Sequence, residues 1–297
     1  MTGPILVTGG TGTLGRPLVQ RLTEQGVSVR VLSRRPAPAE HEIAGKDPAA
    51  IGPRDWATGD LKTGHGIDEA VAGAEVIVHC ATGRGDITAA SNLIEAARRA
   101  GSPHLVYISI VGIDHIQLGY YKSKLDVERQ VEDSGLPWTV LRATQFHELV
   151  LMGCQALARL PVMLMPALSI QPVAAAEVAA RLAELAAGSP AGRVADMGGP
   201  EVHRADELAR MYLDARGRRR PVLPVRIPGA VFAGLRRGAN LTPENATGRM
   251  TFAQFLAGRL GGRSEPDRET ARGHAQPDGG SAPGTAADAQ ANVKGRG

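Results

Sequence analysis

The fold is decided by Ile5-Leu6-Val7-Thr8-Gly9-Gly10-Thr11-Gly12-Thr13-Leu14-Gly15, which passes from an apolar run into a glycine-rich turn. The residues that follow keep apolar side chains at helical spacing, so the turn joins a predicted strand to a predicted helix. Gly9 permits a tight turn, Gly12 lets the backbone approach a pyrophosphate, and Gly15 lets the helix pack closely on the strand. The first N–H groups and the dipole of the helix favour a negatively charged ligand. The stretch therefore predicts a dinucleotide-binding turn, with these residues at the phosphates: Gly9, Thr11, Gly12, Thr13, Leu14 and Gly15.

The rest of the N-terminal half repeats this alternation. Between Pro4 and Ala143, short runs rich in Val, Ile and Leu alternate with longer segments of helical periodicity. Near-continuous apolar runs of this kind are typical of strands that are buried on both faces of a sheet. Gly26, Gly101 and Gly135 each follow a helical segment, where a residue of positive φ commonly ends a helix. The pattern predicts an α/β fold with a doubly wound parallel sheet over residues 1–144.

The alternation weakens after Ala143. Residues 145–263 combine amphipathic helical segments with prolines that interrupt the intervals between them. We expect a smaller, mostly helical C-terminal subdomain there, which would take the substrate. Residues 264–297 have Val293 as their only large apolar side chain. Such a segment cannot offset its own ordering entropy, so we expect a disordered tail.

Composition limits the class of protein. Hydrophobic residues at 43% and charged residues at 22% are ordinary for a globular chain, which excludes collagen-like, wholly disordered and disulfide-scaffold proteins. A net charge of +4 with 3% aromatic residues gives little reason to expect a nucleic-acid partner. Cys80 and Cys154 lie in separate apolar segments, so their spacing builds neither a disulfide framework nor a metal cluster. Without a basic leader or an apolar stretch of ~20 residues, the chain is expected in the cytoplasm and away from membranes.

The end of the second predicted strand, Val31-Leu32-Ser33-Arg34-Arg35, bears on the choice of cofactor. A site for NAD(H) places an acidic residue there to accept the ribose 2′-hydroxyl. No carboxylate is present in this stretch, and Ser33, Arg34 and Arg35 can instead hold a 2′-phosphate by charge-assisted hydrogen bonds. We therefore expect NADP(H) to be preferred over NAD(H). The alternative is that the two arginines only solvate a surface loop.

The fingerprint T-G-x-x-G-x-x-G at Thr8–Gly15 resembles that of the short-chain dehydrogenase/reductase superfamily, in particular its atypical, NmrA-like members. The resemblance extends over roughly residues 4–260 and implies a Rossmann-type fold. Gly59-Asp60-Leu61 resembles the adenine-side motif, and His79-Cys80-Ala81-Thr82-Gly83 stands in the place of the fourth-strand cofactor motif. The resemblance implies that Asp60 and Leu61 lie at the adenine, and that Ala81 and Thr82 lie at the ribose and nicotinamide edge. Taken alone, Asp60 could equally cap the following turn.

Three residues are candidates for catalysis. Ser109 ends an apolar run, while Tyr120 and Lys124 are four positions apart, which places both on one face of a helix. A phenol with a pKa of ~10 relays protons poorly at neutral pH, and a nearby ammonium would lower that pKa. The set resembles the Ser and Tyr-x-x-x-Lys of the superfamily. The resemblance implies that Tyr120 protonates the substrate oxygen, that Ser109 polarises it, and that Lys124 also binds the nicotinamide ribose.

Other readings of these residues stay open. Tyr120 could be a packing residue, and Tyr121 is a second candidate for the reactive phenol. The basic run Arg216-Gly217-Arg218-Arg219-Arg220 could bind nucleic acid or an acidic partner, but at a helix end it more often complements the dipole and stays solvated. His147 and Glu148 could shape a substrate pocket, and no metal is expected there because no third ligand follows at a suitable spacing.

The cofactor signals and the resemblance together imply an NADPH-dependent oxidoreductase that moves hydride to or from a small, largely apolar carbonyl or enone-type substrate. The alternative is a non-catalytic, NmrA-like NADP(H)-binding redox sensor that passes its occupancy to a partner protein. An epimerase fits the same fold but lacks an obvious basic site for a second pyrophosphate. The identity of the substrate and the oligomeric state are left open, since fold does not specify them.

Overall fold

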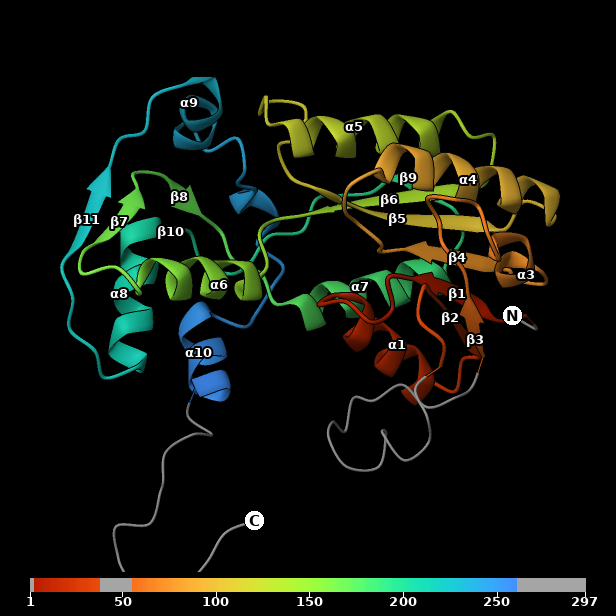
Figure 1. Cartoon of the computed structure of the whole chain (residues 1–297), viewed down its shortest axis with the longest axis horizontal. Coiled ribbons are helices and arrows are strands. Elements are labelled where there is room, and N and C mark those ends of the chain that lie inside the picture. The colour runs from red at the N-terminus through yellow and green to blue at the C-terminus, as the bar shows by residue number, and fades with distance from the viewer. Residues whose placement is uncertain (1–2, 38–54, 261–297) are drawn as a thin grey trace, which may run out of the picture. The chain divides into compact units, whose positions relative to one another are not determined.

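The computed structural model describes residues 3–37 and 55–260, and these carry one central sheet of seven strands (Figure 1). The strands lie in the order β3-β2-β1-β4-β5-β6-β9, and every neighbouring pair is parallel. Their bounds are β1 Ile5–Thr8, β2 Val29–Ser33, β3 Trp56–Thr58, β4 Val76–His79, β5 His104–Ile110, β6 Trp138–Ala143 and β9 Gly192–Arg193. The predicted α/β fold with a doubly wound, Rossmann-type parallel sheet is confirmed.

Helices cover both faces of this sheet (Figure 1). One face carries α1 (Gly15–Glu24) and α7 (Ala175–Ala187), and the other carries α3 (Ile67–Val71), α4 (Asp86–Arg99) and α5 (Gly119–Glu132). The alternation of side chains along a strand explains the two layers, because Ile5 and Val7 enter the first core and Leu6 enters the second. All three are fully buried, which is why the strand is a continuous apolar run in the sequence.

The strand order reverses between β1 and β4. From β1 the chain winds outward to β2 and β3, then returns to β4 and winds to the other side. Open parallel sheets bind their ligands in the crevice outside the carboxyl ends of the strands, at the point where the order reverses. The residues that follow β1, β4 and β5 are therefore the first place to look for a site.

A further hydrophobic core lies beyond the sheet, built mainly by α6, α8, α10 and β7. Two small two-stranded sheets border it, one parallel and one antiparallel. The elements of this region are α6 His147–Leu157, β7 Met163–Pro166, β8 Ser169–Ile170, β10 His203–Arg204, α8 Ala205–Ala215, β11 Val222–Val225, α9 Ala230–Arg236, the 3₁₀ turn η1 Pro243–Asn245 and α10 Phe252–Leu260.

The chain returns to the main sheet after it has entered this region. Val178 and Leu182 of α7 are fully buried in the core that α1 shares, and β9 pairs with β6. The described residues, 3–37 and 55–260, belong to one compact unit. The predicted domain limits at residues 144 and 263 stay a prediction, and the predicted disordered tail, residues 264–297, lies outside the described residues.

Candidate functional site

The glycine-rich turn after β1 has the geometry that its sequence predicts. Gly9 has a φ of +70°, and its carbonyl oxygen accepts a hydrogen bond from the Gly12 N–H at 2.9 Å. A Cβ on Gly9 would lie 2.7 Å from the backbone nitrogen of Ala81, and a Cβ on Gly15 would overlap the Gly9 carbonyl oxygen. The turn therefore packs against both the end of β4 and the start of α1, and only glycine fits at these two positions.

The outer side of the same turn is open. A Cβ on Gly12 would meet, among the described residues, only the Gly9 carbonyl oxygen within 4 Å. Thr11, Gly12 and Thr13 are exposed, and Leu14, at the N-cap of α1, provides no side-chain cap. The first turn of α1 contains no acidic residue. An anion can therefore approach the N-terminus of α1, so the residues present fit a dinucleotide pyrophosphate.

The predicted adenine side lies at the ends of β2 and β3. The Ser33 carbonyl oxygen accepts a hydrogen bond from the Gly59 N–H at 2.9 Å, which joins the two strand ends. Arg34 and Arg35 are exposed, and the Ser33 hydroxyl oxygen accepts a hydrogen bond from the Arg35 N–H at 3.1 Å. One carboxylate oxygen of Asp60 accepts the Lys62 N–H at 2.9 Å. Asp60 thus caps the following turn, and its assignment to the adenine stays a prediction.

The Tyr120 hydroxyl lies at the end of β4. Its oxygen is 3.0 Å from the Thr82 hydroxyl oxygen, and Thr82 in turn donates to a carboxylate oxygen of Asp86 at 3.0 Å. Tyr120 is 44% exposed, although it stands at the start of α5 beside buried residues. Burial of the hydroxyl raises the pKa of Tyr120, and the nearby Asp86 carboxylate acts in the same direction. The structure thus brings together two of the predicted site residues, Tyr120 and Thr82.

Lys124 is buried below this group. The side chain is 4% exposed, and its Nζ lies 5.0 Å from the centre of the Tyr107 ring. Among the described residues Nζ has no hydrogen-bond or ion-pair partner. Burial lowers the pKa of Lys124, and the Asp86 carboxylate opposes that shift. A buried ammonium without an acceptor fits the predicted role of Lys124 as a donor to a ribose hydroxyl.

One part of the proposed chemistry is wrong for the protein without its cofactor. The sequence predicted that Lys124 lowers the pKa of the Tyr120 phenol, whereas that pKa is raised. The physical reason is that burial penalises the phenolate and that the charge nearest to it, at Asp86, is negative. The ammonium of Lys124 sits over Tyr107 instead.

Tyr121, the second candidate for the phenol, points elsewhere. It is 9% exposed and packs with Ile113 and Ile116. Burial raises the pKa of Tyr121, and a hydrogen bond to the Gln145 side chain partly opposes the shift. The two neighbouring tyrosines therefore serve different strand ends, Tyr120 that of β4 and Tyr121 that of β6.

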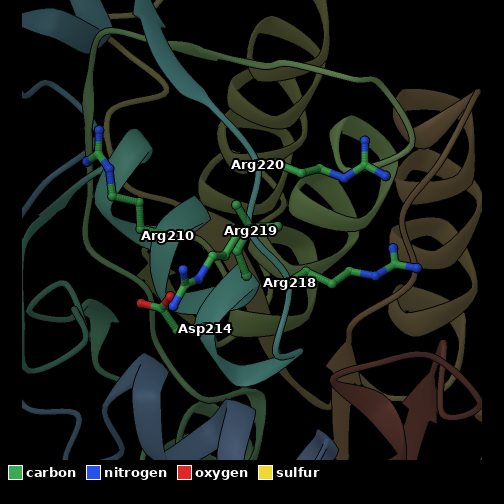
Figure 2. A pocket seen from close by; sticks show the side chains of 6 residues that line it. Arg210, Asp214, Arg218, Arg219 and Arg220 are labelled. Atoms are coloured by element: carbon green, nitrogen blue, oxygen red, sulfur yellow. The ribbon is translucent and has the colours of Figure 1, made fainter.

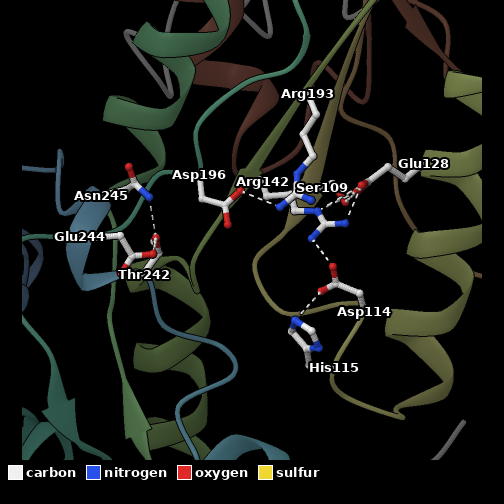
Figure 3. Close-up of polar contacts among 10 residues, drawn as sticks. All are labelled: Ser109, Asp114, His115, Glu128, Arg142, Arg193, Asp196, Thr242, Glu244 and Asn245. Atoms are coloured by element: carbon white, nitrogen blue, oxygen red, sulfur yellow. Dashed lines mark hydrogen bonds and ion pairs between the residues drawn. The ribbon is translucent and has the colours of Figure 1, made fainter.

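Ser109 belongs to a buried charge network rather than to the Tyr120 group (Figure 3). Its hydroxyl donates to a carboxylate oxygen of Glu128 at 2.6 Å. Glu128 also accepts from the Arg142 guanidinium at 2.6 Å, and Arg142 donates to Asp114 at 3.0 Å. Glu128 and Arg142 are nearly fully buried. The network fastens α5, which carries Tyr120 and Lys124, to β5 and β6. Among the described residues Ser109 makes no hydrogen bond to either of them.

The layer below Lys124 is uncharged. The ring nitrogen Nδ1 of His79 is 2.7 Å from the Thr8 hydroxyl oxygen, and the ring stacks on Tyr107 at 5.6 Å between centroids. Burial lowers the pKa of His79 to about 3, with a smaller contribution from Lys124. Burial likewise raises the pKa of the Cys80 thiol to about 12. The ends of β1, β4 and β5 thus present neutral side chains to one buried cation.

Sequence reasoning missed Asp86, Tyr107 and Glu128, and it named His79 only as part of the cofactor motif. An arginine within a predicted buried strand, such as Arg142, requires a carboxylate partner, and that requirement could have pointed to Glu128. No comparable signal marks the other three, because their roles depend on which strand ends become neighbours.

The other candidates lie away from this group. His147 is fully buried and its ring stacks on Phe255 at 5.1 Å, and the interpretation that His147 and Glu148 shape a substrate pocket stays a prediction. The basic run follows α8, where Arg218, Arg219 and Arg220 border a depression of about 190 Å³ together with Arg210, Leu213 and Asp214 (Figure 2). Figure 2 shows the side chains of Arg218 and Arg220 extending away from that of Arg210, so the guanidinium groups do not converge on one point.

Residues 3–37 and 55–260 contain neither a membrane-spanning helix nor a cluster of metal ligands. None of their helices has the length and apolar character needed to cross a bilayer. Within the same ranges, His, Cys, Asp and Glu side chains nowhere gather in threes as metal ligands would.

Comparison with known proteins gives relatives for the N-terminal half. The chain is 33% identical over 157 residues to the chloroplastic protein High chlorophyll fluorescence phenotype 244 of Arabidopsis thaliana, covering 48% of this chain and 37% of the relative. It is 31% identical over 158 residues to an NAD(P)H azoreductase of Xenophilus azovorans, covering 52% of each. The chain thus spans about half, or less, of the length of these curated relatives.

Solved structures match over a longer range. The NADPH-dependent quinone oxidoreductase QOR2 of Escherichia coli, in complex with NADPH, superposes with a TM-score of 0.71 at 19% identity, covering 86% of this chain and 99% of that one. The triphenylmethane reductase of Citrobacter, with NADP(H), gives 0.68 at 19% identity with the same coverage. At this identity the likeness establishes the fold.

A protein-family match covers the N-terminal half of the chain. Residues 9–157, half of the chain, match the family described as NAD(P)H-binding. The match includes most of the glycine-rich turn and the strands from β2 to β6, and this chain belongs to the NAD(P)H-binding family.

Proposed function

We propose that this protein is an NADPH-dependent oxidoreductase that transfers hydride to or from a small, largely apolar carbonyl or enone-type substrate. The observation that carries the proposal is the pairing of an exposed phenol, Tyr120, with a buried ammonium, Lys124, that lacks an acceptor. Both stand on α5 at the carboxyl edge of the sheet, the edge at which open parallel sheets bind their ligands.

Each part of the site has a distinct task in this proposal. The turn at Gly9–Gly15 would hold the pyrophosphate, and Lys124 would donate to a ribose hydroxyl. The nicotinamide, when bound, supplies or takes the hydride. Tyr120 gives a proton to the substrate oxygen during reduction and takes it back during oxidation. Ala81 and Thr82, at the end of β4, would border the nicotinamide.

An apolar substrate is supported by the neighbours of the phenol. Leu118 comes two residues before Tyr120, and Ile87 follows Asp86 directly in the chain. Both are large apolar side chains that are about 40% exposed, at 41% and 39%. Curated relatives with this family's N-terminal half include an azoreductase and a ceramide reductase, whose names describe reductions. We include a preference for NADP(H), held by Ser33, Arg34 and Arg35, in the proposal.

One observation favours the alternative of a redox sensor without turnover. The Ser109 hydroxyl donates its hydrogen to Glu128, so it is not directed at a substrate oxygen. The proposed enzyme therefore works with Tyr120 and Lys124, and Ser109 acts through the Glu128–Arg142 network that positions α5.

The test is turnover together with binding. Purified protein is incubated with NADPH and a panel of ketones, quinones and enones, and the loss of NADPH absorbance is followed. Binding of NADPH is measured in parallel by its fluorescence. An enzyme consumes NADPH with at least one class of the panel. Tight NADPH binding without consumption by any class would contradict the proposal and favour the sensor.

A further inference from the structure

Three side chains from three parts of the fold form a continuous hydrogen-bonded chain. Tyr120 belongs to α5, Thr82 follows β4, and Asp86 is the first residue of α4. Both links, Tyr120 to Thr82 and Thr82 to Asp86, are 3.0 Å long. The two ends of this chain differ in exposure, since Tyr120 is 44% exposed and Asp86 is 7% exposed, while Thr82 between them is exposed. The chain thus leads from the proposed substrate side to a buried carboxylate.

Counting hydrogens fixes the direction of this chain. A threonine hydroxyl has one hydrogen to donate, and that of Thr82 goes to the Asp86 carboxylate. Tyr120 must then donate its own hydrogen to Thr82. A lone pair of the Tyr120 oxygen remains available to a substrate hydroxyl. In this arrangement Tyr120 is therefore a proton acceptor toward the substrate.

The Asp86 side chain lies in an environment that suits a carboxylate. Asp86 stands at the N-terminus of α4, whose dipole favours an anion, and the buried Lys124 on α5 interacts with it electrostatically. The other titratable groups that face the chain are Tyr107 on β5 and Cys80 after β4, and both stay protonated at neutral pH because burial raises their pKa values. Asp86 is therefore the one anion close to Tyr120 among the described residues that interact with it.

We propose that Thr82 and Asp86 are the proton relay behind Tyr120. This rests on the proposed function. During alcohol oxidation the substrate O–H bond breaks and its proton bonds to the Tyr120 oxygen. The original Tyr120 proton passes to Thr82, and the Thr82 proton passes to Asp86, which releases it to water. During reduction each transfer runs in reverse, from a protonated Asp86 to the substrate oxygen.

This relay resolves the difficulty that the phenol poses. Tyr120 never has to exist as a free phenolate, because it receives one proton as it gives up another. The raised pKa of Tyr120 is then no obstacle to proton transfer. Thr82 has a hydroxyl in the right place for this function, which valine, a residue of similar shape, lacks.

The first test uses the protein without cofactor and is independent of activity. The ionisation of Tyr120 is followed by ultraviolet absorbance, as the difference between the parent and Tyr120→Phe, since the chain has four tyrosines. Asp86→Asn removes the neighbouring negative charge and should lower the pKa of Tyr120. Thr82→Val removes a hydroxyl that can turn its hydrogen to a phenolate and should raise it. Shifts of the same sign, or no shift in either variant, would overturn the hydrogen-bonded chain.

The second test uses turnover with NADPH and the best substrate of the panel. Thr82→Val and Asp86→Asn should each slow turnover about 10- to 100-fold, less than the ~10²–10⁴-fold expected for loss of an acid–base group itself. Thr82→Ser, which keeps the hydroxyl, should restore most of the rate. The solvent deuterium isotope effect should change in Thr82→Val, because fewer protons then move together.

The matched control is Asp68→Asn. Asp68 also lies in the first turn of a helix, α3, but it is exposed and paired with Arg99. This variant should keep the parent rate. A parent without turnover would overturn the proposed function and the catalytic use of the relay together. An active parent whose Thr82→Val and Asp86→Asn variants keep its rate and isotope effect would overturn the relay alone.

Discussion

The two neighbouring parts of the candidate site, at the ends of β1 and β4, are built in different ways. At the turn of Gly9–Gly15 the ligand would meet backbone N–H groups, and apart from the buried Leu14 the residues there are glycines or exposed threonines. At the end of β4 the groups are side chains, Tyr120, Thr82, Asp86 and Lys124, drawn from two helices and a strand end. A backbone site can be predicted from spacing along one segment. A side-chain site depends on which segments fold together.

The side-chain part of the site, at the end of β4, is most sharply tested by Tyr120→Phe. Loss of the hydroxyl should slow turnover by ~10²–10⁴-fold, the usual contribution of general acid–base catalysis. Affinity for NADPH should stay within about twofold, because the Gly9–Gly15 turn would hold the phosphates. Lys124→Ala, by contrast, should reduce both turnover and NADPH affinity. Steady-state kinetics and fluorescence titration measure the two effects. An active parent whose Tyr120→Phe variant keeps its rate would shift the role to Tyr121 or to Lys124 alone.

The Glu128–Arg142 network, which fastens α5, should make the stability of the protein sensitive to Arg142→Ala. Removal of the guanidinium leaves the buried Glu128 carboxylate without its ion pair, which typically costs ~3–5 kcal/mol of unfolding free energy. Urea denaturation measures it. Arg193→Ala is the matched control, since its pair with Asp196 lies near the surface (Figure 3) and is worth at most about 1 kcal/mol. Equal losses in the two variants would show that the Glu128–Arg142 network does not fasten α5.

Arg34, directly after β2, should affect the choice of cofactor rather than catalysis, which Arg34→Ala tests. A hydrogen bond to a charged group is worth ~1.5–3 kcal/mol, so affinity for NADPH should fall roughly tenfold to hundredfold. Affinity for NADH should not change, because it lacks the 2′-phosphate, and it serves as the internal control. Equal affinities of the parent for both cofactors would reject the assignment of Arg34.

The smallest effect concerns the neutral layer under Lys124. The pKa of His79 is about 3 in the folded protein and 6.5 in the unfolded chain, so between these values only the unfolded chain binds the proton. Stability should therefore fall as the pH falls below 6.5, by at most about 1.4 kcal/mol per pH unit from this residue.

His79→Gln should flatten that slope in thermal melts between pH 7 and pH 5. Burial lowers the pKa values of His104 and His147 in the same direction, and both remain in the variant. The difference between the two slopes isolates His79. Identical slopes would mean that His79 is not shielded from protons in the folded state.

The sequence predicted the fold because the fold depends on local repeats. Ile5, Leu6 and Val7 form a continuous apolar run since their strand is covered on both faces, and the glycines of the turn stand where a Cβ has no room. The sequence also predicted Tyr120 and Lys124 on one helix face, because residues four positions apart in a helix lie on the same face. These features need no knowledge of distant residues.

The sequence could not predict the partners across the edge. Ser109 was expected to face a substrate, but its hydroxyl donates a hydrogen bond to Glu128, nineteen positions later on α5. Lys124 was expected to act on Tyr120, but Tyr107 offers its ring face instead. Both outcomes depend on the angle at which α5 crosses β5, and no pattern within either segment encodes that angle.

The low reactivity of the two cysteines can report on local opening of the fold. The pKa of Cys80, at the end of β4, is raised to about 12 and that of Cys154, in the core beneath α6, to about 11. The thiolate is the reactive form, so both sulfurs are nearly inert while the chain stays closed. Cys154 is 1% exposed, so a thiol reagent can modify it only when the outer core opens, whereas Cys80 is half-buried. The labelling rate of Cys154 therefore times the opening of the outer core, with Cys80 as the reference for a partly exposed thiol.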